Sequence, residues 1–440
     1  MRASIYTLGC KVNQFESEAI SEQLKAAGFE IVDFGQEAEL FLVNTCCVTS
    51  KAAYQSRQIL RRIRRTWPKA RLVVTGCYVQ TGSQEILDKV KGPICLVGND
   101  QKHRLVELIT EKRCCLEVFV GSIERVKKIA PLIITRPAQR TRAFVRIQDG
   151  CNAFCSYCIV PYARGRSRSL PPKLVKRQIE ILERHQVKEV VLTGIHLGHY
   201  GLDLEDGTNL FSLIRSLCEQ FPEMRFRFSS IEPTEISDEM ISWATSTPNF
   251  CPHWHLPLQS GSDRVLSAMN RRYNARLYME VVLKINQAMP DAAIGADVMV
   301  GFPKEKIEDF ELTVELLRSL PITYVHAFPY SPRPGTLAYA YKNKDPVSGR
   351  EKARRSRIIR KIGSEKKKAF YKAQEGRIYH VLFEHPIAKD KAPDHSLGWW
   401  KGLTPNYIPV LVKGSDSLKN RIKGVRLKTA KPDYVIGDLA

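Results

Sequence analysis

The chain has 440 residues, of which 43% are hydrophobic and 26% charged, a composition typical of globular proteins and unlike that of disordered or fibrous chains. Its formal net charge is +22 and is unevenly distributed. Arg57–Arg71 holds seven basic residues and no acid, and Arg350–Lys372 holds eleven basic residues against two acids. One such run usually marks a solvated helix face, but several on one basic chain favour a polyanionic partner such as nucleic acid.

The beginning of the sequence and its apolar segments give no sign of a membrane or secretory protein. Only six residues separate Arg2 from Gly9, and no segment approaches the roughly 20 apolar residues of a membrane span. We therefore expect no leader, no membrane partner and a cytoplasmic location. Twelve cysteines in such a chain favour metal or redox chemistry over disulfides.

The first hundred residues alternate between short apolar runs and segments of helical spacing. The runs predict strands at Ser4–Leu8, Leu40–Val43, Arg71–Val74 and Ile94–Val97. The intervening segments predict helices at Glu16–Ala27 and Tyr54–Arg65. Strands joined by helices form a parallel sheet, so we expect an α/β domain over residues 1–115. Residues 116–141 lack strong periodicity and predict a connection.

Three of these strands each end in a cysteine. The cysteines are Cys10, Cys46 and Cys77, called the strand-end trio below. Ligands bind at the carboxyl ends of parallel strands, so the trio is expected to converge there. Gly9 and Gly76 would let the backbone approach a bulky ligand. An iron–sulfur cluster with three protein ligands is one interpretation, and three small buried core residues are the other. Cys46 and Cys47 compete for one position, and the strand-end Asn-Thr-Cys pattern favours Cys46.

The remaining cysteines outside the motifs receive no functional role. Cys114 and Cys115 form a vicinal pair that we leave unassigned, and Cys95, Cys218 and Cys251 stand singly, as structural cysteines do.

From residue 143 the alternation resumes on a larger scale. Strands are predicted at Ala143–Ile147, Glu189–Thr193, Arg225–Ser229, His253–Pro257, Ala293–Val300 and Tyr324–Pro329. Helices are predicted at Pro172–His185, Asn209–Phe221, Asp238–Ala244, Ala275–Ala288 and Glu305–Leu320. Such β/α units predict a partial, TIM-like barrel over residues 137–368, with its site at the carboxyl ends of the strands. His196 and His255 follow or lie in these strands and are either functional bases or hydrogen-bonded structural residues.

A second cysteine motif follows the first strand of this barrel. It has the spacing C-x3-C-x2-C, and its members are Cys151, Cys155 and Cys158, called the loop trio below. A structural zinc ion is normally bound by four ligands, and no Cys or His follows Cys158 closely. Three thiolates without a fourth favour a 4Fe–4S cluster with one iron open to a small molecule. Zinc and unliganded core cysteines remain the alternatives.

After the predicted basic helix Lys352–Lys368 the pattern changes to short strands, predicted at Ile378–Phe383, Tyr407–Val412 and Arg421–Leu427. We expect a small antiparallel β-barrel over residues 369–440, a class that often binds RNA. Trp399, Trp400 and Tyr407 either stack on bases or form its core.

Longer motifs carry a resemblance to a known family. Gly150–Arg166, which contains the loop trio, resembles the radical SAM superfamily and, beyond its cysteines, the methylthiotransferase branch. His255–Ser262 and Asp297–Pro303 are similar to further blocks of that branch. The strand-end trio is similar to the trio of the branch's N-terminal domain, and the terminal barrel resembles a TRAM domain. At Lys304-Glu305-Lys306 the chain departs from the usual Gly-Glu-Thr.

The resemblance implies cofactors and partners. The loop trio would bind a 4Fe–4S cluster coordinated with S-adenosylmethionine, and the strand-end trio would bind an auxiliary 4Fe–4S cluster. The partners implied are tRNA at its anticodon loop, an electron donor and a sulfur source that stays open. No catalytic residue is implied beyond the cluster ligands.

The resemblance also suggests a substrate. Thr7–Gln14 and Val43–Thr49 look most like the subgroup that adds a methylthio group to C2 of N6-threonylcarbamoyladenosine in tRNA, next to the anticodon. The isopentenyladenosine subgroup usually has Gln-Met-Asn where this chain has Lys11-Val12-Asn13, and the ribosomal-protein subgroup has Pro-Lys-Asn. Methylthiolation of isopentenyladenosine or of a ribosomal protein stays open, as does an RNA-binding protein with structural zinc.

Overall fold

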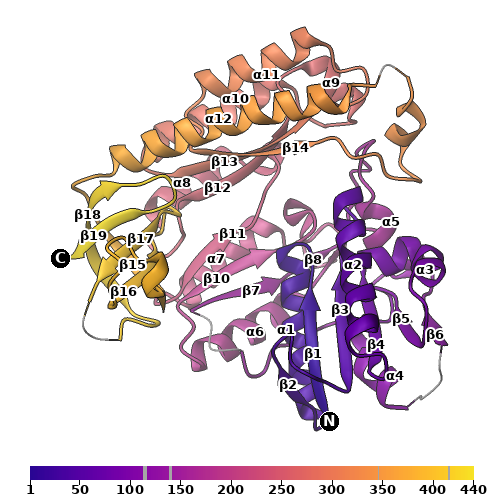
Figure 1. Cartoon of the computed structure of the whole chain (residues 1–440). Helices are drawn as coiled ribbons and strands as arrows, with labels where there is room; N and C mark the ends of the chain where they lie inside the picture. Colours follow the sequence, from indigo (N-terminus) through magenta and orange to yellow (C-terminus); the bar gives the residue numbers. More distant parts are fainter. Residues whose placement is uncertain (112–115, 138–140, 345, 415–416) are drawn as a thin grey trace.

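The computed structural model describes residues 1–111, 116–137, 141–344, 346–414 and 417–440. Three units follow one another along the chain: an N-terminal parallel sheet, a central pair of parallel sheets and a closed barrel of five strands (Figure 1). This is the multidomain α/β architecture that the sequence predicts. Among the residues described, no helix is long and apolar enough to cross a bilayer.

The N-terminal sheet is parallel throughout and has the strand order β2-β1-β3-β4-β5-β6. Its strands are β1 (Arg2–Thr7), β2 (Glu30–Val32), β3 (Leu40–Thr45), β4 (Arg71–Gly76), β5 (Ile94–Val97) and β6 (Leu116–Phe119). Its helices are α1 (Lys11–Ala26), α2 (Ser50–Thr66), α3 (Cys77–Lys89), η1 (Lys102–Arg104) and α4 (Leu105–Glu111). Helices pack on both faces of the sheet, so β3 and β5 are buried along their whole length and appear in the sequence as continuous apolar runs.

Two strands of this sheet were not predicted, and both lie at its edges. β6 falls in residues 116–141, which the sequence analysis expected to be a connection, and it pairs with β5. Its Leu116 is 57% exposed, while its buried Glu117 pairs with Arg71 at 2.9 Å. An edge strand that is half exposed and contains a buried acid has no apolar run, which is why sequence patterning misses it.

The central unit holds two three-stranded parallel sheets, β7-β10-β11 and β12-β13-β14. Its strands are β7 (Arg142–Arg146), β10 (Glu189–Thr193), β11 (Arg225–Phe228), β12 (His253–Gln259), β13 (Ala293–Val300) and β14 (Tyr324–Pro329). Its longer helices are α6 (Pro172–Arg184), α7 (Leu210–Gln220), α8 (Asp238–Ser246), α10 (Ala275–Ala288) and α11 (Ile307–Ser319), with the short α9 (Asp263–Ala268) after β12. A bridge between Phe226 and Phe250 joins the sheets, so the strands follow one another as a partial barrel, as predicted.

Capped helices and a small hairpin complete the central unit. The side chains of Asn209, Ser237 and Asn274 accept a hydrogen bond from the backbone three residues on, which fixes the starts of α7, α8 and α10. The loop trio lies between β8 (Gln148–Asp149) and α5 (Val160–Arg164), and β8 pairs with β9 (Arg168–Ser169).

Helix α12 (Gly349–Ala373) runs along β14 and leads into the C-terminal barrel (Figure 1). A Cβ on Gly363 would lie 3.1 Å from Val325 of β14, so the helix packs closely against the strand. The helix extends past residue 368, where the sequence analysis placed the end of the central domain. This boundary stays a prediction, and α12 physically links the two units.

The barrel closes in the order β15-β16-β17-β19-β18. Its strands are β15 (Ile378–Pro386), β16 (Trp399–Leu403), β17 (Pro409–Lys413), β18 (Ile422–Ala430) and β19 (Val435–Leu439). Four pairings are antiparallel as expected, whereas β17 and β19 are parallel. Trp399 is buried and Trp400 packs against the barrel core, so both occupy core positions.

Candidate functional site: two cysteine trios and a shared cavity

The strand-end trio lies at one edge of the N-terminal sheet. Cys10 precedes α1, Cys46 directly follows β3, and Cys77 begins α3, and the strands that lead to them, β1, β3 and β4, are neighbours. Gly9 has a φ of 105°, and a Cβ there would lie 3.3 Å from the Cys46 Sγ. The positive φ and the short distance to Cys46 therefore both favour glycine at position 9.

Asn13 fixes the loops that carry this trio. Its Nδ2 donates to the carbonyl of Leu8 at 2.7 Å and to that of Thr45 at 3.1 Å, and Asn44 Nδ2 donates to the Asn13 carbonyl at 3.0 Å. These bonds join the residues just before Gly9 and Cys46. The sequence analysis quoted Asn13 only as part of a motif and did not predict this role.

All three residues of the strand-end trio line a cavity of about 1430 Å³. The same cavity is lined by His255 and Tyr324 of the central unit, by Arg360 of α12 and by Tyr407 of the barrel. The three units of the chain thus meet around one space. Its size suits a nucleoside-sized ligand with room for further contacts.

Cys46 and Cys47, which competed for one position, have different surroundings. Cys46 lines the cavity, whereas Cys47 is fully buried in the apolar cluster below and accepts a hydrogen bond from Thr81 at 3.4 Å. Burial raises the pKa of the Cys46 thiol to about 12. A thiol so placed keeps its proton unless a metal replaces it, and a metal ion would favour the thiolate.

The loop trio is held by a tight turn after β8. Gly150 has a φ of 76°, and a Cβ there would lie 1.9 Å from the Arg166 carbonyl oxygen. Phe154 also has a positive φ, 47°, and the Cys158 amide donates to the Cys155 carbonyl at 2.9 Å. The contiguous motif is therefore folded into a compact loop by its own backbone.

N–H groups surround the sulfur atoms of this loop. Arg271 Nη1 donates to Cys155 Sγ at 3.3 Å, and the Ala153 amide donates to Cys151 Sγ at 3.4 Å. His196 Nδ1 lies 3.3 Å from Cys151 Sγ. Burial raises the pKa of Cys158 to about 12. Hydrogen bonds to sulfur are typical of the surroundings of iron–sulfur ligands.

His196 has polar partners at both ring nitrogens, since its Nε2 lies 2.5 Å from Glu235 Oε1. Burial lowers the pKa of His196, but the bonds to Cys151 and Glu235 outweigh it and raise the pKa to about 10. His196 thus has the geometry of a hydrogen-bonded structural residue, the second alternative of the sequence analysis.

The loop trio approaches the cavity without lining it. Val160, which follows the loop, and Thr193-Gly194-Ile195, which precede His196, line the cavity wall, and among the residues described the loop trio is not part of that wall. The two trios therefore flank the same space but are exposed to it differently.

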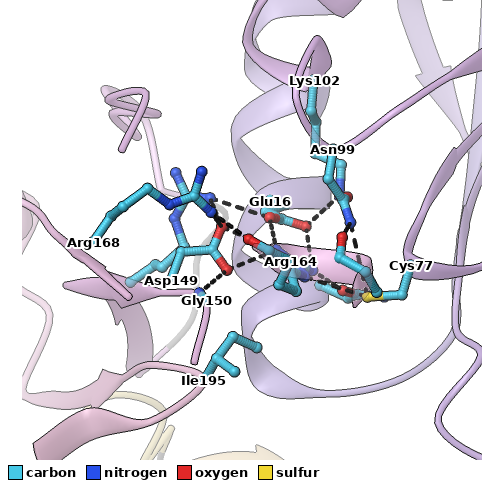
Figure 2. Close-up of polar contacts among 12 residues, drawn as sticks. Glu16, Cys77, Asn99, Lys102, Asp149, Gly150, Arg164, Arg168 and Ile195 are labelled. Atoms are coloured by element: carbon cyan, nitrogen blue, oxygen red, sulfur yellow. Dashed lines mark hydrogen bonds and ion pairs between the residues drawn. The ribbon is translucent and has the colours of Figure 1, made fainter. Parts of the chain in front are cut away.

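Arg164 links the two halves of the site (Figure 2). It lies in α5, just after the loop trio, and is fully buried. Its Nε donates to Cys77 Sγ at 3.2 Å, its Nη2 to Asn13 Oδ1 at 2.5 Å, and its Nη1 to Glu16 Oε1 at 2.5 Å. The sequence analysis included Arg164 only within the motif Gly150–Arg166, since a buried arginine has no pattern of its own.

Glu16 in α1 gathers further charges around Arg164. Lys102 Nζ lies 2.6 Å from Glu16 Oε2, and Arg146 Nη1 lies 3.1 Å from Glu16 Oε1 and 3.3 Å from Asp149 Oδ2. Burial would raise the pKa of Glu16, but Arg164, Lys102 and Arg146 outweigh it and hold the pKa below its usual range. The cluster joins the N-terminal and central units by ion pairs.

The wall of the cavity opposite the strand-end trio is polar. Asp297 Oδ1 lies 3.1 Å from His255 Nε2 and 3.2 Å from His326 Nδ1, and the hydroxyl of Tyr324 lies 3.0 Å from His255 Nδ1. The ligand atoms of these two histidines and the aspartate lie within 4.8 Å of one another, close enough for a metal ion. The hydrogen bonds account for the arrangement without one.

Tyr407 joins this wall from the C-terminal barrel. Its ring stacks on His253 with centroids 4.2 Å apart, and the guanidinium of Arg227 lies over it at 5.1 Å. Tyr407 thus packs against side chains of the central unit at a position that also lines the cavity, and its stacking on RNA bases stays a prediction.

The charges that line the cavity are mostly positive. They come from Lys11, Lys51, Arg360 and Lys367, against the single carboxylate of Asp297 among the residues described. Lys367 pairs with Asp433 outside the cavity. Lys11 makes no hydrogen bond or ion pair with any described residue, and burial, with smaller contributions from Arg227 and Arg142, lowers its pKa to about 8. A half-buried cation without a partner is a candidate anion site.

The donor sets fit iron–sulfur clusters better than zinc. Each trio offers three thiols that form no disulfide, and N–H donors from Arg164, Arg271 and His196 face the sulfurs. A closed zinc site would need a fourth Cys or His, and His196 is already engaged with Glu235. Cys114 and Cys115 lie outside the described residues.

Two family models match the chain. One, described as the uncharacterized protein family UPF0004, covers residues 2–98, and the other, the radical SAM superfamily, covers residues 145–317. The first match spans the strand-end trio, and the second spans the loop trio and the barrel strands β10, β11, β12 and β13, with only the end of β7.

Curated relatives match over nearly the whole chain. The threonylcarbamoyladenosine tRNA methylthiotransferase MtaB of Aquifex aeolicus is 39% identical over 94% of this chain and 97% of its own, and that of Bacillus subtilis is 35% identical over 98% and 94%. A tRNA-2-methylthio-N(6)-dimethylallyladenosine synthase of Thermus thermophilus is 33% identical over 100% and 92%. Among solved structures, the radical S-adenosylmethionine methyltransferase TsrM from Kitasatospora setae, with cobalamin and a [4Fe-4S] cluster bound, superposes with a TM-score of 0.56 at 14% identity, covering 77% of each chain.

Proposed function

The chain belongs to the tRNA methylthiotransferase family of radical SAM enzymes, and on this premise we propose that it methylthiolates C2 of N6-threonylcarbamoyladenosine in tRNA, next to the anticodon. The net reaction replaces the C2–H bond of the adenine ring by a C2–S–CH3 group. The hydrogen would leave as part of 5′-deoxyadenosine formed from one S-adenosylmethionine, the methyl group would come from a second S-adenosylmethionine, and the sulfur would be delivered at the auxiliary cluster. Relatives with the higher identities, 39% and 35%, are named for this substrate, whereas others that match as fully at 31–33% identity are named for dimethylallyladenosine.

We propose that the loop trio holds the 4Fe–4S cluster that binds S-adenosylmethionine and that the strand-end trio holds an auxiliary 4Fe–4S cluster. Together these groups supply one-electron cleavage of S-adenosylmethionine and the delivery of sulfur. The protein's own contribution is to hold the six thiolates, to exclude water from the space between them and to orient the base. His196 and Arg271 would hold the sulfurs of the loop trio through their N–H groups.

The observation that carries this proposal is the shared cavity. Cys10, Cys46 and Cys77 line one side of it, the segment Thr193–Ile195 beside the loop trio lines another, and His255 and Asp297 form the opposite wall. A base splayed out of a single-stranded loop would lie between the two trios there.

Lys11 supports the choice of the threonylcarbamoyl substrate. The threonyl group carries a carboxylate, whereas the dimethylallyl group of the alternative substrate is apolar. Lys11 has no hydrogen-bond or ion-pair partner among the described residues, and it offers its cation in the cavity, next in sequence to Cys10. A charge-assisted hydrogen bond to the carboxylate would contribute about 1.5–3 kcal/mol, whereas an apolar group would leave the cation unpaired.

We propose that the basic helix α2 and the cavity residues Lys51 and Arg360 contact the phosphates of the tRNA. α2 buries Ala53, Ser56, Leu60 and Ile63 and exposes the basic residues Lys51, Arg61, Arg62 and Arg65. Phosphate contacts of this kind position the RNA without reading its sequence. The chemistry also requires a one-electron donor, which we propose is a separate reductant.

Mass spectrometry of tRNA nucleosides tests the function. Deletion of the gene should remove 2-methylthio-N6-threonylcarbamoyladenosine and leave N6-threonylcarbamoyladenosine in its place, and the restored gene should reverse this. Loss of the methylthio group from dimethylallyladenosine instead would favour the substrate of the Thermus thermophilus relative. No change in either nucleoside would refute a tRNA substrate of this kind.

A further inference from the structure

A buried cluster of charges joins the N-terminal and central units next to the strand-end trio (Figure 2). Its members, called the ion cluster below, are Glu16, Lys102, Arg146, Asp149, Arg164 and Arg168. Each is at most 6% exposed. Glu16 and Lys102 come from the N-terminal unit and the other four from the central unit, so the cluster forms only when the two units are docked.

The ion cluster carries more positive than negative charge. Its three arginines outnumber its two carboxylates even without Lys102, and arginine stays protonated in proteins. Uncompensated charge in a buried site is unfavourable unless a further group of opposite sign completes it. Asp203 offsets part of this excess beside Arg168, so the cluster lacks an anion on the side of Arg164.

The geometry shows where this anion belongs. Arg164 Nε points away from the carboxylates and donates to Cys77 Sγ at 3.2 Å, and Asn99 Nδ2 approaches the same sulfur at 4.0 Å. The carboxylates of Glu16 and Asp149 take up the other side of the guanidinium. Among the described residues, Cys77 is the one group capable of negative charge that Arg164 contacts and that accepts no hydrogen bond from another cation, although it also interacts electrostatically with Lys102.

We propose that the ion cluster is an electrostatic partner of the strand-end site, and that Arg164 is a positioning residue that raises the reduction potential of a cluster held there. This inference rests on the auxiliary 4Fe–4S cluster proposed above. Reduction adds one electron and therefore one negative charge to the cluster and its thiolates. A fixed cation and an N–H···S bond stabilise that charge, so the potential rises.

A second consequence follows from the origin of Arg164 in the central unit. The residue lies in α5, directly after the loop trio, and reaches across the domain interface to a sulfur of the other trio. The electronic state of the strand-end site thus depends on docking of the two units. A strand-end cluster in an undocked chain would have a lower potential than in the docked enzyme.

The test uses the full chain with Cys151→Ala, Cys155→Ala and Cys158→Ala, which leaves only the strand-end site, reconstituted anaerobically with iron and sulfide. A redox titration followed by electron paramagnetic resonance gives the midpoint potential. We expect Arg164→Gln to disfavour reduction at least tenfold, which is about 59 mV for one electron. Arg164→Lys keeps the charge but loses the guanidinium fork, and should recover part of this shift.

Arg168→Gln is the matched control. Arg168 belongs to the same buried cluster and carries the same charge, but its contacts are Asp149 and the Arg164 carbonyl, not a sulfur. We expect it to shift the midpoint by less than half as much. An Arg164→Gln variant with full iron content and an unchanged midpoint, or one shifted no more than Arg168→Gln, would overturn the inference.

If the Arg164→Gln variant fails to load the strand-end site with iron, the same substitution is made in the chain with both trios intact, and the iron content of that variant is measured. Loss of about four of eight irons, with the loop-trio cluster retained, supports a specific role for Arg164 at the strand-end trio. Equal loss from both sites identifies a merely structural residue and refutes the inference. A parent variant with no iron at all would instead refute the proposed auxiliary cluster, so the two failures are distinguishable.

Discussion

The loop trio and the strand-end trio each present three thiols, but the chain brings the two sets together in different ways. The loop trio is contiguous in sequence, and its own turn, with positive φ at Gly150 and Phe154, folds it. The strand-end trio is assembled from the ends of three strands, and Asn13 and Arg164 hold its parts together across loops and across a domain interface.

The geometry of the loop trio is determined locally, whereas that of the strand-end trio is determined by tertiary structure. The loop trio needs a short motif and a few N–H donors, and it is set back from the cavity wall. The strand-end trio needs the docked fold, and its residues line the cavity. On the proposed function, the trio that depends on the fold is therefore the one that lines the space where the substrate would bind.

The largest effect is expected when a whole trio is removed. Substituting all three cysteines of either trio by alanine should leave about four irons of about eight and should abolish the methylthio product. The loop-trio variant should also lose formation of 5′-deoxyadenosine from S-adenosylmethionine, whereas the strand-end variant should retain it. Iron analysis and chromatography measure both. If the strand-end variant still makes the methylthio product, the strand-end trio is not required for the reaction, and its proposed role is wrong.

A single pair of neighbours gives a sharper version of the same test. Cys46→Ala should lose the strand-end cluster and the product, because Cys46 lines the cavity. Cys47→Ala should keep both and lower the free energy of unfolding by only about 1 kcal/mol, the usual cost of trimming a small buried side chain. Iron content and denaturant unfolding of the two variants decide. Equal iron loss in both would show that the assignment of Cys46 is wrong.

Lys11 extends the comparison from metal binding to substrate choice. Lys11→Met should lower kcat/KM for a tRNA anticodon stem-loop bearing N6-threonylcarbamoyladenosine by about ten- to a hundredfold, since a charge-assisted bond of 1.5–3 kcal/mol is lost. Lys51→Met is the control, because Lys51 also lines the cavity but is exposed. Similar losses in both variants would indicate general phosphate attraction in place of carboxylate recognition.

Sequence patterns predicted most of the fold because the chemistry of its elements is local. The bounds of β5, β10, β13 and β14 are those predicted, since each strand is a short apolar or β-rich run closed by turn residues. Edge strand β6 was not predicted, because its half-exposed position gives it no such run. The parallel pairing of β17 with β19 follows from closure of the barrel, which no local pattern encodes.

The site divides in the same way. Cysteine spacing points to the loop trio, and the repeated strand–cysteine pattern points to the strand-end trio. Arg164 and Lys11 appear in the sequence as ordinary basic residues. The proposed role of Arg164 comes from its burial and its contacts, and that of Lys11 from its having no hydrogen-bond or ion-pair partner among the described residues. Both depend on segments more than a hundred residues apart in the chain.

Acid should weaken the docking on which the strand-end trio depends. The pKa of Glu16 is held below its usual range in the folded chain, so its contribution to stability is present above the unfolded pKa of about 4.3 and is lost as pH falls. Between pH 6 and pH 3 the wild type should lose on the order of 2 kcal/mol more than Glu16→Gln. Thermal unfolding across this range measures the difference, and parallel curves would contradict it.

The smallest expected effect concerns how the RNA reaches the cavity between the trios. Arg360 lines the cavity and makes no ion pair with a described residue, so Arg360→Gln should weaken tRNA binding a few-fold and reduce the slope of log K against log salt by about 0.7–0.9, one phosphate contact. Arg276→Gln is the control, because Arg276 is exposed on α10 and pairs with Glu280. Filter binding at several salt concentrations gives both slopes. If the control changes the slope as much as Arg360→Gln does, the RNA is attracted by the overall charge of the chain, and the cavity mouth beside the strand-end trio is not its binding face.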